Sequence, residues 1–359
     1  MIVERTSYIP KQGSAEKVLQ TRHKACDVRV FLGLAPGDVF VEESETGPVI
    51  HWSCSFSSEK EHRRDLEARD QSPEFNSVRK NMQQLIDKFE RHFLKESPRS
   101  GSVLQETVLN NLPITPAEHS FESNGIELKG YLYQPPGAGP FPCLIFNHGS
   151  TINQGSADVC RPGIACHLMS WGLAVFMPHR RGYGNSPGTP WQEAVGAPFG
   201  TPEYDSNLIP RLQDEADDVV AAYKYIKTLS AVQTDHIGVM GSSFGGITTL
   251  LAAVKEPGFR CAVEFAGAAM NWLIAARLKN FLLLEATKIT QPIYFAQAEN
   301  DFCTSPTKEL AAAALEHNGS VYSKIYPQFG LTNMEGHFLC GQGWPIWKDD
   351  IRWFLEKYL

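Results

Sequence analysis

The stretch His236-Ile-Gly-Val-Met-Gly-Ser-Ser-Phe-Gly-Gly246 decides the fold of this chain. Its first five residues form an apolar run that is typical of a buried strand, and the residues after it are rich in Thr, Leu and Ala, which favours a helix. Gly-x-Ser-x-Gly lies between the two, where the glycines permit a tight turn that holds a serine in an exposed position. The N-terminus of the helix directs its partial positive charge at this position. We therefore predict a strand–turn–helix unit that presents a nucleophilic serine.

Two adjacent serines compete for the role of nucleophile. If the motif were centred on Ser242, Met240 and Phe244 would stand where glycines belong, so the frame of the motif selects Ser243. A serine hydroxyl is a poor nucleophile until a base removes its proton, so a histidine has to lie near Ser243 in the folded chain.

The base is expected after the serine, because motifs of this kind are followed first by an acid and then by a histidine. Only His317 and His337 come after Ser243. His317 lies at the end of a predicted helix, where a solvated surface position is expected. His337 follows the flexible loop Asn333-Met-Glu-Gly336, which can bring an imidazole ring over the edge of the sheet. We predict His337 as the base.

The acid that orients this histidine is expected just after the preceding strand, which we place at Pro292–Ala298. Glu299-Asn-Asp301 follows that strand. Asp301 stands directly before the next predicted helix and is the preferred candidate, while Glu299 is the competitor. Glu335 is too close to His337 in the sequence to be its obvious partner, and we expect it at most to tune that loop.

Backbone N–H groups are expected to stabilise the oxyanion of an acyl-transfer reaction. One donor is Phe244, the residue after the nucleophile. The other belongs to the turn Phe146-Asn-His-Gly-Ser-Thr151, which follows the first buried parallel strand. Ser150 is preferred for this role, and the sequence leaves Thr151 open as the alternative.

Strands and helices alternate regularly from residue 118 to residue 359, which is typical of a doubly wound, mostly parallel α/β sheet. An Asn124-Gly125 hairpin opens this part of the chain. Helices are predicted near 157–170, 212–229, 245–255 and 306–317. The segments 185–210 and 267–290 are read as irregular, and we expect them to form the substrate pocket or a lid. Arg180 and Arg181 are expected to brace a loop through backbone carbonyls rather than to bind an anion.

Residues 1–110 form a separate unit, joined to the rest by a proline-rich linker at 111–117. Its predicted order is βαββαβ, the pattern of α+β ferredoxin-like folds. The second helical stretch is expected to resume after Ser72-Pro73 and to reach about Lys95, and the last strand is placed at 102–109. His23, His51 and Trp52 lie in this unit, but we assign them no chemistry, because a histidine on a partly buried face is common.

Composition narrows the function classes. The chain has 359 residues, 42% hydrophobic and 20% charged, which is typical of a globular protein. Its net charge of −7 makes a nucleic-acid partner improbable. No apolar stretch approaches the roughly 20 residues that span a bilayer, so no membrane partner is expected. The eight cysteines include no Cys-x-x-Cys pair, and we expect free thiols in the cytoplasm and neither a metal nor a cofactor.

The segment from about 118 to 359 resembles the dienelactone-hydrolase-like and prolyl-oligopeptidase-like members of the α/β-hydrolase superfamily. The matching residues are Gly241–Gly246, Asn147-His-Gly149, His179-Arg-Arg-Gly-Tyr-Gly184 with Ser186, Asp301 and Gly336-His337. Two positions depart from the family pattern. Dienelactone hydrolases proper use a cysteine where this chain has Ser243, and many relatives have an aspartate in place of His179.

The resemblance implies a carboxylesterase-like serine hydrolase with a Ser243–Asp301–His337 triad, which cleaves an ester, lactone or thioester of a small molecule. Amide hydrolysis of the oligopeptidase type is the alternative, although no β-propeller repeat precedes the hydrolase segment. A non-catalytic interaction protein is a further alternative. Haloalkane dehalogenation would need a carboxylate nucleophile at position 243.

The N-terminal part resembles the dimeric α/β-barrel domains of the antibiotic-monooxygenase and NIPSNAP type. The resemblance depends on the element order, the Tyr8-Ile-Pro-Lys-Gln-Gly13 start and the Gly33-Leu34 pair after the first helix. It implies that residues 1–110 pair two copies of the chain into a homodimer.

Overall fold

The computed structural model divides the chain into two compact units, Met1–Gly101 and Ser102–Leu359. It describes residues 2–43, 47–56, 58–95, 104, 106–107, 109, 114–156 and 161–359. Within these ranges, no helix combines the length and apolarity that crossing a membrane requires. We call Met1–Gly101 the N-terminal unit and Ser102–Leu359, which carries the predicted nucleophile Ser243, the catalytic unit.

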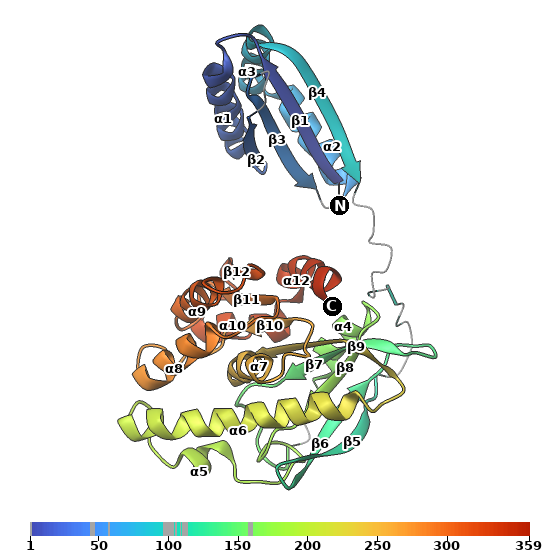
Figure 1. Cartoon of the computed structure of the whole chain (residues 1–359), viewed down its shortest axis with the longest axis vertical. Helices are drawn as coiled ribbons and strands as arrows, with labels where there is room; N and C mark the ends of the chain where they lie inside the picture. The colour runs from blue at the N-terminus through green and yellow to red at the C-terminus, as the bar shows by residue number, and fades with distance from the viewer. Residues whose placement is uncertain are drawn as a thin grey trace. The chain divides into compact units, whose positions relative to one another are not determined.

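The N-terminal unit contains a four-stranded antiparallel sheet in the order β2-β3-β1-β4 (Figure 1). One face of the sheet packs against helices through a small apolar core that includes Tyr8, Val18, Trp52 and Met82. Successive residues of β3 alternate between this core and the opposite face, as expected for a half-buried strand. The elements are β1 Ile2–Pro10, α1 Ala15–Phe31, β2 Asp38–Glu42, β3 Val49–Phe56, α2 Glu59–Gln71, α3 Pro73–Leu85 and β4 Ile86–Lys95.

The last strand of this unit is not where we predicted it. Helix α3 ends at Leu85, and residues 86–95 form β4, which pairs antiparallel with β1 so that Tyr8 lies opposite Phe89. The spacing of Ile86, Phe89 and Phe93 imitates a helical period, but pairing with β1 overrides that local preference.

The segment 102–109, predicted as that strand, contributes instead to the catalytic unit. Its described residues are not in a strand. Leu104 is buried in an apolar cluster of the catalytic unit, and the Thr107 N–H donates to the Ser170 carbonyl over 2.9 Å. Residues 111–113 of the predicted linker lie outside the described residues.

The catalytic unit is built on an eight-stranded sheet in the order β12-β11-β10-β9-β7-β8-β6-β5 (Figure 1). The six strands from β12 to β8 are parallel, and β6 and β5 add an antiparallel edge. The strands are β5 Ala117–Ser123, β6 Ile126–Tyr133, β7 Phe141–Asn147, β8 Ala174–Pro178, β9 Val232–Ser242, β10 Ala262–Phe265, β11 Ile293–Ala298 and β12 Val321–Tyr326.

Helices cover both faces of this sheet, which is why its central strands are apolar throughout. Helices α6 to α9 share one apolar cluster with the sheet, whereas α4, α11 and α12 share the other. The helices are α4 Pro162–Met169, α5 Trp191–Val195, α6 Pro202–Ile226, α7 Phe244–Lys255, α8 Ala276–Ala286, α9 Ser305–Leu315, α10 Asn333–His337, α11 Leu339–Gln342 and α12 Trp344–Tyr358. The fold is the doubly wound, mostly parallel α/β sheet that the sequence predicts.

Two segments predicted as irregular contain helices. Helix α6 begins at Pro202, inside the segment 185–210, and continues through Pro210. Helix α8 lies within 267–290, and the Asp205 carboxylate caps its first turn by accepting the N–H groups of Arg277 and Leu278 over 2.7 and 2.8 Å. The two helices are therefore fixed to each other by a charged cap.

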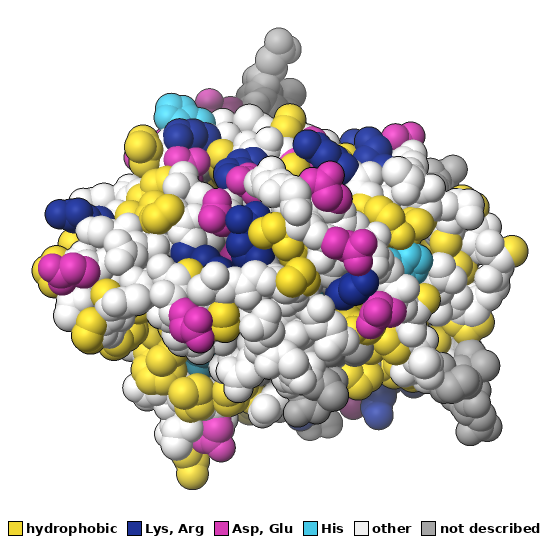
Figure 2. All heavy atoms as spheres, turned by 90° about the horizontal axis from the view of Figure 1, so that it is seen from below, with side chains coloured by type: hydrophobic (Ala, Val, Ile, Leu, Met, Phe, Trp, Pro, Cys, Tyr) yellow, Lys and Arg dark blue, Asp and Glu magenta, His cyan; other side chains and the backbone are white. Residues whose placement is uncertain are grey.

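On the face seen in Figure 2, Lys and Arg side chains lie among Asp and Glu side chains, with apolar groups between them. Such mixing is typical of a solvated surface. Some of these charged side chains on the catalytic unit form ion pairs. Lys255 pairs with Asp217, and Lys324 Nζ lies 2.7 Å from a carboxylate oxygen of Asp350.

Candidate active site

Ser243 occupies a strained backbone position between β9 and α7. Its φ of 60° and ψ of −123° are unusual for a residue with a side chain. Hydrogen bonds on both sides hold this conformation: the Ser243 N–H donates to the Phe265 carbonyl over 2.9 Å, and the Ser243 carbonyl accepts from Ile247 over 3.1 Å. The turn lifts the hydroxyl away from the sheet at the N-terminus of α7.

The two glycines of the motif are required by close packing of the backbone. A Cβ atom on Gly241 would lie 2.2 Å from the Gly245 carbonyl oxygen. A Cβ atom on Gly245 would lie 2.1 Å from the carbonyl oxygen of Asn147, at the end of β7. The tight turn thus depends on the absence of side chains at both positions, and it brings the loop after β7 against Ser243.

Ser243, His337 and Asp301 form a continuous chain of hydrogen bonds. His337 Nε2 is 3.0 Å from Ser243 Oγ, and His337 Nδ1 is 2.9 and 3.1 Å from the two carboxylate oxygens of Asp301. A carboxylate only accepts, so Nδ1 carries the proton and Nε2 is left to accept from the serine hydroxyl. Both His337 and Asp301 are buried. The structure brings together the three residues that the sequence selects.

Three further groups fix the Asp301 carboxylate beside β11. The Phe302 N–H donates to Oδ1 over 2.6 Å, and the Gln297 amide donates to Oδ2 over 2.9 Å. The Thr307 hydroxyl in turn holds the Gln297 side chain over 2.9 Å. Sequence reasoning missed Gln297, which lies within an apolar strand and carries no motif.

The segment that carries His337 is a short helix, α10, rather than the flexible loop that we predicted. Thr332 and Glu335 form a capping box at its start, in which Glu335 accepts the backbone N–H groups of Leu331 and Thr332. These bonds lower the pKa of Glu335. Glu335 therefore shapes the segment without touching the imidazole.

Asn300 attaches the same segment to the end of β11. Its amide donates to the carbonyls of Phe329 and Thr332, both over 2.9 Å, and its Oδ1 accepts the Phe329 N–H over 2.8 Å. Gly336 packs on Asn300 so closely that an added Cβ would lie 2.7 Å from Asn300 Oδ1. The Gly-His pair of the sequence is explained by this contact.

The competing candidates lie outside the hydrogen-bonded chain. His317 is exposed beyond the end of α9, and Glu299 is exposed at the end of β11. Neither takes part in the hydrogen bonds around Ser243 that the described residues form.

The predicted oxyanion donors lie at the expected elements. Phe244 is the first residue of α7, where the backbone N–H has no partner within the helix. The loop of Gly149 and Ser150 lies against the nucleophile, because a Cβ atom on Gly149 would be 3.4 Å from Ser243 Cβ. Trp191 supports both sides: its indole N–H donates to the Ser150 carbonyl over 3.2 Å, and its ring contacts Phe244. The choice of Ser150 over Thr151 stays a prediction.

Buried charges brace this loop from behind. Arg180 is fully buried, with its Nε 2.7 Å from Glu215 and its Nη2 donating to the His148 carbonyl over 2.7 Å. The bracing role expected for Arg180 is thus found. Burial and the neighbouring Arg180 and His179 hold the pKa of His148 well below its usual value, so its ring is neutral and serves as a structural group.

Glu264 is a second buried carboxyl in the same region. It lies on β10 and accepts the N–H of Gly267. Burial, opposed by that bond and reinforced by the charge of Asp301, raises the pKa of Glu264 to about 8. The side chain is therefore mostly protonated at neutral pH.

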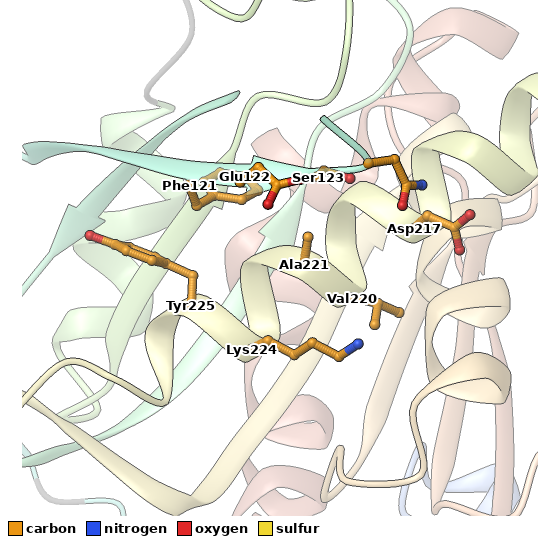
Figure 3. Close-up of a pocket in the computed structure, with 9 residues that line it drawn as sticks. Phe121, Glu122, Ser123, Asp217, Val220, Ala221, Lys224 and Tyr225 are labelled. Carbon is orange, nitrogen blue, oxygen red and sulfur yellow. The ribbon is translucent and has the colours of Figure 1, made fainter. Parts of the chain in front are cut away.

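A cavity lies elsewhere in the catalytic unit. It encloses about 520 Å³ between β5 and α6, with Phe121, Asp217, Lys224 and Tyr225 in its wall (Figure 3). None of its lining residues belongs to the triad, so we assign it no part in the chemistry. Among the described residues, no group of three or more His, Cys, Asp or Glu side chains is placed to hold a metal ion.

Five large side chains from the segments 185–210 and 267–290, where the substrate pocket or a lid is expected, lie in three settings. Trp191 alone is seen in contact with the nucleophile turn. Tyr204 and Trp272 are packed in the core, while Phe199 and Met270 are exposed.

Comparison with known proteins places this geometry in a family context. Esterase Pf2001 of Pyrococcus furiosus superposes with a TM-score of 0.51 at 17% identity, covering 74% of this chain and 99% of that one. An acetyl xylan esterase from Paenibacillus sp. R4 gives a TM-score of 0.50 at 18% identity, over 71% of this chain and 88% of that one. At such identities the likeness establishes the α/β-hydrolase fold.

Two relatives align in sequence over shorter stretches. The quorum-quenching protein AidA of Acinetobacter baumannii is 25% identical over 148 residues, which is 41% of this chain and 42% of that protein. The uncharacterized peptidase YtmA of Bacillus subtilis is 26% identical over 136 residues, which is 38% of this chain and 44% of that protein. The chain thus spans less than half the length of either relative.

The dienelactone hydrolase family matches residues 129–331, which is more than half of the chain and includes Ser243 and Asp301. The fold, the turn that carries Ser243 and this match agree. The chain belongs to the dienelactone hydrolase family.

Proposed function

We propose that the chain hydrolyses carboxylic esters of small molecules, lactones and thioesters included, through an acyl-enzyme on Ser243. The observation that carries the proposal is the unbroken Asp301–His337–Ser243 hydrogen-bond chain at the strained turn. This arrangement supplies an activated nucleophile, a general base and an anion that orients the base.

In the proposed reaction, His337 Nε2 takes the hydroxyl proton as Ser243 Oγ attacks the ester carbonyl carbon. The N–H groups of Phe244 and Ser150 stabilise the tetrahedral oxyanion. His337 then gives its proton to the leaving alcohol, and the acyl group stays on Ser243. A water molecule, deprotonated by His337, attacks the acyl carbon, the bond to Ser243 Oγ breaks, and His337 returns the proton to Oγ as the carboxylic acid is released. Asp301 stabilises the imidazolium that forms in both halves.

Amide hydrolysis remains the second candidate, because one of the related proteins is named a peptidase. The same steps would apply, with an amine as the leaving group. The described part of the N-terminal unit is a single sheet with helices rather than propeller blades, unlike the architecture expected of a prolyl oligopeptidase. We therefore place ester cleavage first.

A fluorophosphonate probe and a panel of p-nitrophenyl esters and lactones test the proposal. The wild-type chain should be labelled and should turn over at least one ester, whereas Ser243→Ala should lose both activities. Ser242→Ala is the matched control and should be labelled like the wild type, because the motif frame leaves Ser242 out of the reaction.

Matched p-nitrophenyl ester and p-nitroanilide substrates with the same acyl group separate the two candidates. A higher kcat/KM for the ester supports the esterase proposal, and a higher value for the anilide favours the peptidase. Absence of labelling, or equal turnover by Ser243→Ala, would exclude both.

We also propose that the chain forms a homodimer through its N-terminal unit, as its resemblance to dimeric α/β-barrel domains implies. Exposed apolar side chains at the sheet edges, such as Phe40 on β2 and Leu94 on β4, support this. Sedimentation of the full chain tests it, and a monomer at micromolar concentration would contradict it.

A further inference from the structure

The N-terminal unit encloses a cavity between its sheet and helices α1 and α3. The cavity measures about 180 Å³. Much of its wall is apolar, with Trp52, Phe75, Val78, Met82 and Phe89 contributing. A space of this size lined by apolar groups suits a single ring or a short aliphatic chain, since a cavity of about 150 Å³ accommodates benzene.

Four arginines also line this space, and we call it the arginine cavity: Arg22, Arg69, Arg79 and Arg91. Three of them already have carboxylate partners. Glu4 is 2.8 Å from Arg69 and 3.2 Å from Arg91, and Asp70 is 2.8 Å from Arg79. Each of these three cations thus has an anion of the chain within ion-pair distance.

Arg22 is the exception. Its side chain comes from α1 and is only 4% exposed. Nη1 donates to the Tyr8 hydroxyl over 3.1 Å and Nη2 lies 3.8 Å from Cys26 Sγ, while Nε is buried without a partner. None of the ion pairs found among the described residues includes Arg22.

A buried cation without a counter-ion is costly, and the surroundings of Arg22 offset only part of that cost. Its guanidinium carbon lies 4.8 Å from the centre of the Trp52 ring, which provides a cation–π contact. The neutral hydroxyl of Tyr8 contributes one hydrogen bond. A carboxylate that entered the cavity would supply the missing charge and the acceptor for Nε.

We propose that the arginine cavity binds a small monocarboxylate, with the carboxylate on Arg22 and an apolar ring or short chain against Trp52, Val78 and Met82. A single unpaired arginine surrounded by apolar walls suits one negative charge on an apolar body. Inorganic phosphate, with its higher charge and no apolar part, fits this wall poorly. The proposal concerns the N-terminal unit alone and does not depend on hydrolysis at Ser243.

Calorimetric titration of the full chain at neutral pH tests the proposal, with benzoate and hexanoate as probes. Benzyl alcohol, hexan-1-ol and inorganic phosphate serve as comparison ligands. Both carboxylates should bind at millimolar concentration or below, and each should bind more tightly than its alcohol and than phosphate. If neither carboxylate binds, or if the alcohols or phosphate bind as well, the proposal is overturned.

Variants locate the ligand. Arg22→Met should weaken carboxylate binding about tenfold to a hundredfold, because a charge-assisted hydrogen bond is lost. Arg5→Met is the matched control, since Arg5 is exposed on the opposite face of β1, and it should bind like the wild type. Binding that persists in Arg22→Met would place the ligand elsewhere, for instance beside Ser243, and would overturn the proposal.

A second variant covers the case in which Arg22→Met fails to fold. Val78→Trp should fill the cavity from α3 while it leaves Arg22 in place, and it should abolish binding of benzoate. A rise in the melting temperature of the wild type with benzoate, absent in Val78→Trp, supports the proposal. Equal rises in both chains contradict it.

Discussion

The triad of the catalytic unit and the arginine cavity of the N-terminal unit both hold ionisable groups away from water, but they partner those groups differently. At the triad, Asp301 and His337 are joined to each other, and the charged Arg180 behind the site is paired with Glu215. In the arginine cavity, Arg22 has no carboxylate partner among the residues that the structure describes. A site that performs chemistry on a bound substrate needs its charges fixed beforehand, whereas a site that binds an anion gains by leaving one cation unpaired.

The largest expected effect comes from removing the anion of the triad. Asp301→Asn should lower kcat for p-nitrophenyl esters by about 10⁴-fold, because the amide no longer favours the tautomer in which Nε2 accepts. Rates measured under saturating ester check this. Glu299→Gln is the control at the competing position and should stay near the wild-type rate; a comparable loss there would make Glu299 the acid.

The next prediction compares the free energy of unfolding after removal of a paired arginine and of an unpaired one. Arg180→Met should lower the free energy of unfolding by about 3 kcal/mol or more, because it leaves Glu215 buried with one cation fewer. Arg22→Met, made without added ligand, should leave that free energy unchanged or raise it by about 1 kcal/mol, because no anion is left behind.

Urea unfolding of both variants provides the measurement. Equal destabilisation by the two substitutions would show that Arg22 is as well compensated as Arg180, and the contrast between the two sites would fail.

Another effect follows from Glu264, whose raised pKa makes stability depend on pH. Between the ordinary carboxyl pKa of 4.5 and the raised value of about 8, the folded chain holds a proton on Glu264 that the unfolded chain has released. Stability from this group is therefore lost as the pH rises, by about 1.4 kcal/mol per pH unit. Glu264→Gln should remove this slope, so that its advantage over the wild type grows from pH ~5 to pH ~8. Urea unfolding across this range checks the prediction, and parallel profiles would refute it.

The smallest predicted effect concerns the support of the oxyanion loop. Trp191→Phe keeps a ring beside Phe244 but removes the hydrogen bond to the Ser150 carbonyl, and it should lower kcat/KM about three- to tenfold. Trp353→Phe, on α12, is the matched control and should change the rate little. If Trp191→Phe matches that control, the indole has no part in positioning the loop.

The sequence predicts the triad well because the motif around Ser243 is a local pattern, and because the acid and the base follow it in a fixed order along the chain. Close approaches to Asn147 and Gly245 demand glycines around Ser243, and this demand appears directly as a motif. The order of acid and base along the chain then leaves few choices. Asp301 follows the end of β11 and His337 lies in the segment after β12, so neither needs knowledge of long-range packing.

Other features depend on contacts that no short pattern encodes. Strand β4 has the apolar spacing of a helix and is decided by its pairing with β1. Helix α6 passes through Pro210, and packing against the sheet outweighs that local penalty. Arg22 looks in the sequence like any charged residue of a helix, and its isolation becomes visible only when α1, β1 and β3 are assembled.

The contacts of Asn300 have a mechanical consequence for the triad. Asn300 holds the backbone at Phe329 and Thr332, while the adjacent Asp301 holds the ring of His337. The acid and the base are therefore both attached to the end of β11, whereas Ser243 is attached to β9 and α7. The hydrogen bond between His337 Nε2 and Ser243 Oγ, 3.0 Å long, connects these two parts of the triad. Any motion that separates the nucleophile from its base therefore has to lengthen this one hydrogen bond.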